Sequence, residues 1–182
     1  PLDPDIEIPI RLKNSLVSCA GENYSKKAFT LISELFGNVD DHSKSQLPGF
    51  AGLQTYRPKD LTKVQIVISD HGEGIAGTLF PILEEKYPEI YKRLGGINPD
   101  ADLVLEVFKR GQLSSINEDG RGLGLKRSGD IAAHFDAIVS VRQARFELIM
   151  EYEGGKLKGH RVKPDLVKLS GTHISLNFLI DS

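Results

Sequence analysis

The stretch VQIVISDHGEGI at residues 64–75 is the strongest local signal in the chain. Alternate residues from Val64 to Ile68 share one face of an extended segment and Val67 lies on the other, which predicts a strand covered, or nearly so, on both sides. The strand ends at Asp70, where a glycine-rich turn begins. Because a carboxylate at the end of a covered strand is costly to bury without a partner, this position is a candidate site.

Outward from this strand, hydrophobic periodicity predicts helices and strands that are partly segregated along the chain. An edge strand is expected at residues 6–12, where apolar residues from Ile6 to Leu12 alternate with polar residues and Pro9. A helix with an apolar stripe is expected at residues 25–42. The remaining predictions are a short strand near 52–56, helices at 79–94, 101–110 and 123–135, a mobile loop at 111–122 and strands at 137–141, 146–152 and 173–180. We therefore expect an α+β fold, a two-layer sandwich with helices on one face of a mixed, mostly antiparallel sheet.

The composition indicates one domain without a dominant charge. The chain has 182 residues, of which 40% are hydrophobic, and its net charge of −2 gives no overall basic surface for nucleic acid or an anionic membrane. The basic stretch from Lys156 to Lys168 is interpreted as a solvated loop between two strands. The single cysteine indicates a reducing compartment, so we expect a cytoplasmic protein, and no apolar run approaches the ~20 residues of a membrane span. The chain begins at Pro1, so we expect residues 1–182 to be one domain of a longer protein.

A polar group recurs along one side of the helix predicted at residues 25–42. Glu34, Asn38 and His42 follow one another at intervals of four residues, so they project to one side of a helix. Asp41 lies three residues after Asn38 on the same side. The amide oxygen of Asn38 is a suitable ligand for a Mg²⁺ ion shared with phosphates, and a carboxylate one turn away can accept a proton. Alone, this spacing is equally typical of a solvated polar face.

The turn after residue 69 combines a hydrogen-bond acceptor with backbone freedom. Asp70 can accept a hydrogen bond from the amino group of adenine. Gly72 and Gly74 allow backbone angles that other residues avoid, and they leave room for a flat ring. The same pattern is also typical of an acid that caps a turn or a helix start.

A second glycine-rich segment, GRGLGL at residues 120–125, precedes a predicted helix. Backbone N–H groups and the positive end of the helix dipole can face phosphate oxygens at such a place. The segment lacks the Gly-Lys-Ser/Thr of a Walker A loop and the strand context of a dinucleotide fingerprint. Further on, Gly171-Thr172 opens the last predicted strand, and Thr172 can hydrogen-bond Asp70 directly or through water.

Taken in order, these four segments resemble the motifs of the GHKL superfamily. This is the group of gyrases, heat-shock chaperones, histidine kinases and MutL proteins with a left-handed ATP-binding fold, the Bergerat fold. The resemblance extends from about residue 25 to residue 180. It implies a Mg·ATP-binding domain that catalyses γ-phosphoryl transfer, with a lid over the nucleotide at about residues 75–122.

The resemblance also implies roles for individual residues. Asn38 looks like the magnesium-binding asparagine, and Asp70 looks like the aspartate that binds adenine, with Thr172 supporting it. Glu34 is similar to the general base of the gyrase and MutL branches. The other residues expected to contact the nucleotide are Asp41, His42, Gly72, Gly74, Ile75, Gly120, Arg121, Gly122, Leu123, Gly124 and Leu125.

The sequence leaves the branch of the superfamily open. Asp41 resembles the ATP-hydrolysing gyrase side, and Glu34 is similar both to that side and to anti-sigma serine kinases, where it would activate the acceptor hydroxyl. Residues 120–125 look like the glycine box of kinases, and the pair His42-Ser43 is similar to anti-sigma serine kinases. We favour a protein kinase domain of signal transduction, with a gyrase-like hydrolase, a nucleotide-dependent interaction module and a scaffold without nucleotide as alternatives. The expected partners are ATP, Mg²⁺ and a protein phosphoacceptor or partner domain outside this chain, with a homodimer as a further possibility.

Overall fold

The computed structural model describes residues 7–20, 22–42, 45, 47–56, 61–96, 98–110 and 124–181. Within these ranges it describes the backbone alone of residues 19, 20, 22–25, 28, 38–42, 61, 110, 124–128 and 179–181. The loop predicted at 111–122 lies outside the described residues.

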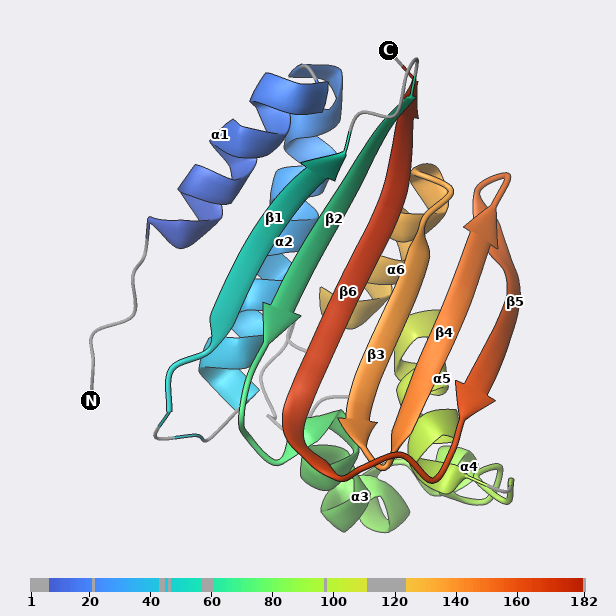
Figure 1. Ribbon diagram of the computed structural model, residues 1–182. Helices are drawn as coiled ribbons and strands as arrows, with labels where there is room; N and C mark the ends of the chain where they lie inside the picture. Colours follow the sequence, from blue (N-terminus) through green and yellow to red (C-terminus); the bar gives the residue numbers. More distant parts are fainter. Residues whose placement is uncertain are drawn as a thin grey trace.

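A six-stranded sheet forms one layer of the molecule (Figure 1). Its order is β1-β2-β6-β3-β4-β5, and each neighbouring pair is antiparallel, so the sheet expected to be mixed is wholly antiparallel in the described residues. The last strand of the chain lies in the middle of the sheet, between β2 and β3. The strands are β1 Phe50–Tyr56, β2 Leu61–Ser69, β3 Ile138–Ala144, β4 Phe146–Glu153, β5 Lys156–Lys163 and β6 Leu169–Asp181.

Helices form the second layer, which confirms the predicted α+β sandwich. In Figure 1, α1, α2, α5 and α6 lie behind one face of the sheet, and α3 and α4 lie near its lower end. The helices are α1 Ile8–Ala20, α2 Glu22–His42, α3 Gly74–Lys86, α4 Pro88–Tyr91, α5 Pro99–Arg110 and α6 Gly124–His134. Among the residues described, no helix is both long enough and apolar enough to cross a membrane.

The hydrophobic core lies between the sheet and the helices. Val64 and Ile66 of β2 are fully buried, and the stacked rings of Phe135 and Phe178, with centroids 5.1 Å apart, extend the core across β6. Val67 points to the opposite face and is 36% exposed. The prediction that β2 is covered on both sides is therefore wrong, because an antiparallel sheet can leave one face to solvent.

The first element is a helix, so the edge strand predicted at residues 6–12 is wrong. Leu12 and Leu16 lie four residues apart and are 8% and 0% exposed, whereas Ile10, in the supposed alternation, is 51% exposed. The helical period becomes visible only when the pattern is followed beyond residue 12. Pro9 is compatible with α1 because it lies in the first turn, where its missing N–H has no intrahelical acceptor.

The helix predicted at residues 79–94 is two helices and starts earlier. Helix α3 already begins at Gly74, directly after the glycine-rich turn, and ends at Lys86. Tyr87 separates it from α4, since a residue that precedes a proline is disfavoured in the helical conformation. The other predicted helices correspond to α2, α5 and α6, each within a few residues.

The basic stretch interpreted as a loop contains an edge strand, β5. Its cations lie opposite carboxylates of β4: Arg161 donates to Glu151 at 2.8 Å, and Lys163 donates to Glu147 at 2.8 Å. Hydrogen bonds from Lys163 and from Ser140 lower the pKa of Glu147. Lysines on an edge strand also discourage pairing with other chains. The high charge of β5 therefore follows from its place at the edge of the sheet.

Helices α5 and α6 pack closely because residue 129 has no side chain. A Cβ atom at Gly129 would lie 2.9 Å from the backbone oxygen of Phe108 and 3.2 Å from the hydroxyl of Tyr152. By contrast, a Cβ at Gly37, in α2, would meet nothing within 4 Å.

We expect Gly129→Ala to destabilise the protein by about 1–3 kcal/mol, because the added methyl group pushes α6 away from α5. Gly37→Ala is the matched control and should raise stability by up to ~1 kcal/mol, since alanine favours the helix. Urea unfolding followed by circular dichroism measures both. A Gly129→Ala protein at least as stable as the parent would contradict the close packing of the two helices.

Candidate functional site

The candidate site lies at the end of the sheet where β2 and β3 finish and β6 begins (Figure 1). The start of α3 and the C-terminal end of α2 lie at the same end of the molecule. This arrangement brings together the turn after β2 and the Gly171-Thr172 pair, which are about a hundred residues apart in sequence.

Asp70 is the buried centre of this site. Its side chain is 6% exposed, and its Oδ1 accepts a hydrogen bond of 2.7 Å from the N–H of Gly72, which closes the turn on itself. In the part of the chain that the structure describes, Oδ2 has no hydrogen-bond partner. Asp70 thus presents one carboxylate oxygen that can accept a bond from a ligand.

The predicted association of Asp70 with Thr172 is present as a backbone contact. The N–H of Asp70 donates to the carbonyl oxygen of Thr172 at 2.9 Å, which extends the β2–β6 ladder by one residue beyond Ser69. Thr172 is itself 6% exposed. In the described residues no direct hydrogen bond joins its hydroxyl group to the carboxylate, so only the bond through water stays a prediction.

Gly171 allows this close approach of the two strands. It has a φ of +80°, and a Cβ at this position would lie 2.1 Å from the backbone oxygen of Asp70 and 2.7 Å from its Oδ1. Any side chain here would both strain the backbone and displace the carboxylate.

Gly74 also adopts a conformation that favours glycine. Its φ is +76°, and a Cβ would lie 1.9 Å from the side-chain amide of Gln143, at the end of β3. Gln143 is 2% exposed and lies opposite Thr172 in the β3–β6 register. The sequence reasoning missed Gln143, although it is the one polar residue in the buried alternation that starts with Val139 and Val141.

The structure places the first helical motif only in part. Glu34 is half-buried on α2, beside the buried Leu35. The backbone of α2 carries Asn38, Asp41 and His42, but their side chains lie outside the described residues. The roles assigned to these four polar residues stay predictions.

The second glycine-rich segment is described only at its end. Gly124 is the first residue of α6, as predicted for a glycine box that leads into a helix, and Leu125 follows in the helical backbone. Gly120, Arg121, Gly122 and Leu123 lie outside the described residues, so their contact with phosphates is not tested. Ile75 lies in the first turn of α3 and is half-buried.

The chain is similar to a solved gyrase subunit. The B subunit of the DNA gyrase from Myxococcus xanthus matches with 11% sequence identity and a TM-score of 0.46. The match covers 96% of this chain and 43% of that chain. No protein-family model and no curated protein matches the sequence. A likeness at this level assigns no function to the chain, which has to be argued from its own residues.

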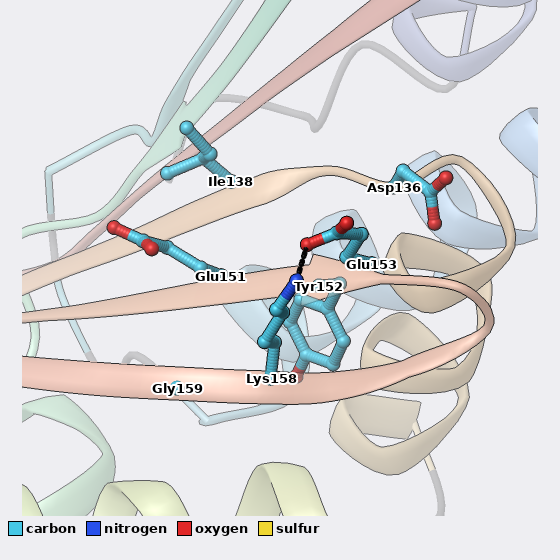
Figure 2. Close-up of a pocket in the computed structure, with 7 residues that line it drawn as sticks. All are labelled: Asp136, Ile138, Glu151, Tyr152, Glu153, Lys158 and Gly159. Carbon is cyan, nitrogen blue, oxygen red and sulfur yellow. Dashed lines mark hydrogen bonds and ion pairs between the residues drawn. The ribbon is translucent and has the colours of Figure 1, made fainter.

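A separate cavity of about 480 Å³ lies against β3, β4 and β5, and Figure 2 shows the side chains around it. It contains none of the predicted site residues. Two of its carboxylates already have cationic partners: Glu151 is paired with Arg161, and Glu153 is paired with Lys158. Burial raises the pKa of Tyr152 to about 12. Lys158, the one cation among the lining residues, is paired with Glu153, and Asp136 adds a further carboxylate, so the cavity has no spare cation for a triphosphate and does not compete with the Asp70 site. It is lined by Asp136, Ile138, Glu151, Tyr152, Glu153, Lys158 and Gly159.

We expect Gly171→Ala to destabilise the protein by about 2–4 kcal/mol, because the methyl group meets the Asp70 backbone in a left-handed conformation. The amide of Asp70, which is bonded to Thr172, should exchange with solvent faster than in the parent. Gly159→Ala in β5 is the control, since a Cβ there meets nothing within 4 Å. Equal stability of the two variants would rule out the close strand approach described above.

Proposed function

We propose that this chain is an ATP-binding domain of the GHKL type that binds the adenine base at Asp70. The observation that carries the proposal is the buried carboxylate at the end of β2, with one oxygen committed to the turn and the other available. The available oxygen is not among the fully buried side-chain atoms of the described residues, so a donor group of a ligand can reach it. The exocyclic amino group of adenine is a donor of the right kind.

The backbone around Asp70 is suited to a flat ring. Gly74 and Gly171 both have positive φ angles: Gly171 lies directly against Asp70, and Gly74 lies four residues after it, at the start of α3. Neither places a Cβ beside it, so a purine can approach the backbone closely. Gly72 has the further task of donating its N–H to Oδ1, which fixes the direction of the remaining oxygen.

The phosphate end of the nucleotide would be held by residues of α2 and of the segment before α6. We propose that Asn38 binds the Mg²⁺ ion, that Glu34 acts as general base and that residues 120–125 receive the phosphates through backbone N–H groups. When bound, the metal ion would neutralise charge that develops on the phosphate oxygens. The chain's own task is to position the reactants and to accept a proton at the Glu34 carboxylate.

Two reactions compete for this site. The kinase-like glycine box favours transfer to a protein, Asp41 favours hydrolysis as in gyrases, and Glu34 is compatible with both. We propose protein kinase activity, with a phosphoacceptor outside this chain. Incubation with γ-labelled ATP, Mg²⁺ and an added mixture of acceptor proteins distinguishes the reactions: label on the added protein supports the kinase, free phosphate supports the hydrolase, and binding without either supports an interaction module.

Asp70→Asn should weaken Mg·ATP binding about 10- to 100-fold, because asparagine has only one acceptor oxygen for the Gly72 N–H and the adenine amino group together. Calorimetry measures the affinity. The parent should prefer ATP to inosine triphosphate, which lacks the amino group, and the variant should lose that preference.

Asp136→Asn is the control for this change, because Asp136 is exposed, precedes β3 at the end of that strand opposite to the site, and has a φ of +47° that asparagine tolerates. It should bind Mg·ATP as the parent does. A parent chain that binds no Mg·ATP, or an Asp70→Asn protein with unchanged affinity and base preference, would refute the adenine site.

Glu34→Gln should leave Mg·ATP affinity within about threefold of the parent and reduce turnover by about 100-fold or more, because glutamine cannot accept the proton of the attacking group. Release of γ-phosphate and label on protein are measured at saturating ATP. If turnover persists unchanged while binding is intact, Glu34 is not the base.

A further inference from the structure

We propose that Gln143 is a positioning residue that caps helix α3 from the neighbouring strand β3 and so holds the adenine-binding turn in place. This inference rests on the proposed function for its effect on nucleotide binding, whereas the capping itself can be tested without a nucleotide. Gln143 would touch neither the base nor the phosphates. It would act through the turn from Asp70 to Gly74.

Helix α3 needs a cap from outside its own sequence. The first N–H groups of any helix lack intrahelical acceptors and are usually satisfied by a serine, threonine, aspartate or asparagine at the N-cap. The N-cap of α3 is Glu73, which has a helical φ of −75° and ψ of −14°, and its side chain makes no capping hydrogen bond. Helix α5 shows the ordinary arrangement, because Asn98 Oδ1 accepts the N–H of Ala101 at 3.1 Å.

Gln143 supplies the missing acceptor to α3. In the amide orientation that satisfies its neighbours, its side-chain oxygen accepts the N–H of Ile75 at 2.9 Å and the N–H of Ala76 at 3.1 Å. These are the second and third residues of α3, the positions that an N-cap side chain normally serves. Since Gln143 is 2% exposed, water cannot readily replace it, and the two bonds also satisfy its own buried oxygen.

The same side chain fixes the turn against the sheet. The backbone of Gly74 packs directly on the Gln143 amide, as the 2.6 Å approach of a Cβ to the amide carbon shows. Gln143 lies opposite Thr172, whose carbonyl oxygen accepts the N–H of Asp70. Gln143 therefore connects both ends of the turn: one through the start of α3, and the other through β6.

Loss of this connection should change the orientation of the Asp70 carboxylate. The direction of Asp70 Oδ1 is set by the N–H of Gly72, two residues before Gly74. A displacement of the α3 start would move Gly72 and Gly74 relative to β6, and with them the oxygen offered to adenine. Gln143 thus determines nucleotide affinity by pre-organising the turn.

Amide hydrogen exchange measured by NMR without nucleotide tests the cap. In the parent, the amides of Ile75 and Ala76 should be protected although they have no acceptor within α3. Gln143→Met, which keeps the length of the side chain but removes the acceptor, should raise their exchange about tenfold or more. Gln143→Glu keeps an oxygen acceptor and should restore their protection. Gln65→Met is the control, because Gln65 bonds Ser175 on the outer face of the sheet.

Calorimetry with Mg·ATP on the same proteins tests the positioning. Gln143→Met should weaken binding about tenfold, while turnover at saturating ATP changes less than twofold, and Gln65→Met should match the parent. Unprotected Ile75 and Ala76 amides in the parent would overturn the cap without need of any variant. Faster exchange in Gln143→Met with unchanged affinity would overturn the positioning role. If the parent binds no nucleotide, the proposed function fails, and the exchange data alone still decide the cap.

Discussion

The candidate site depends on the pairing of β2 with β6, continued by one further bond from the Asp70 N–H to the Thr172 oxygen. This last bond keeps a carboxylate at the edge of the core, where an ordinary strand end would let it turn to solvent. It is possible only because Gly171 has no side chain where the two backbones meet. Since β6 is the last strand in sequence and a central strand in space, the site forms only when the C-terminal end of the chain enters the sheet.

The two faces of the sheet explain how the site can be both anchored and open. On the helix-facing side, Val64, Ile66 and Leu176 are nearly fully buried, which fixes the register of β2 and β6. A slip of one residue would move these side chains to the outer face, where Val67 is already 36% exposed. Hydrophobic burial therefore sets the register, and the register in turn decides that residue 70 lies beside residue 172.

The sequence was sufficient for features that depend on local patterns. The apolar strand that ends at Asp70, the glycine turn, α2, the start of α6 and the antiparallel C-terminal strands follow from periodicity and turn residues, and the structure confirms them. The first helix was mistaken for a strand because four apolar residues, Ile6, Ile8, Ile10 and Leu12, alternate with other residues around its start. Strand β5 was missed because its cations are balanced by glutamates of β4, which no local pattern reveals. The role of Gln143 was not predicted for a similar reason, because its partners, Ile75 and Ala76, belong to another element.

The division of the proposed site between two layers has a mechanical consequence. The adenine end is built on the sheet and the start of α3, whereas the proposed magnesium and phosphate ligands belong to α2 and to the segment that leads into α6. These two helices pack against each other, and Lys27 of α2 contacts His134 of α6 at 3.0 Å. A nucleotide that engages both ends would therefore tie the helical layer to the sheet. The lid predicted at about residues 75–122 would lead from the sheet side to the helix side, so it is the part of the chain that we expect to respond when the two layers are joined.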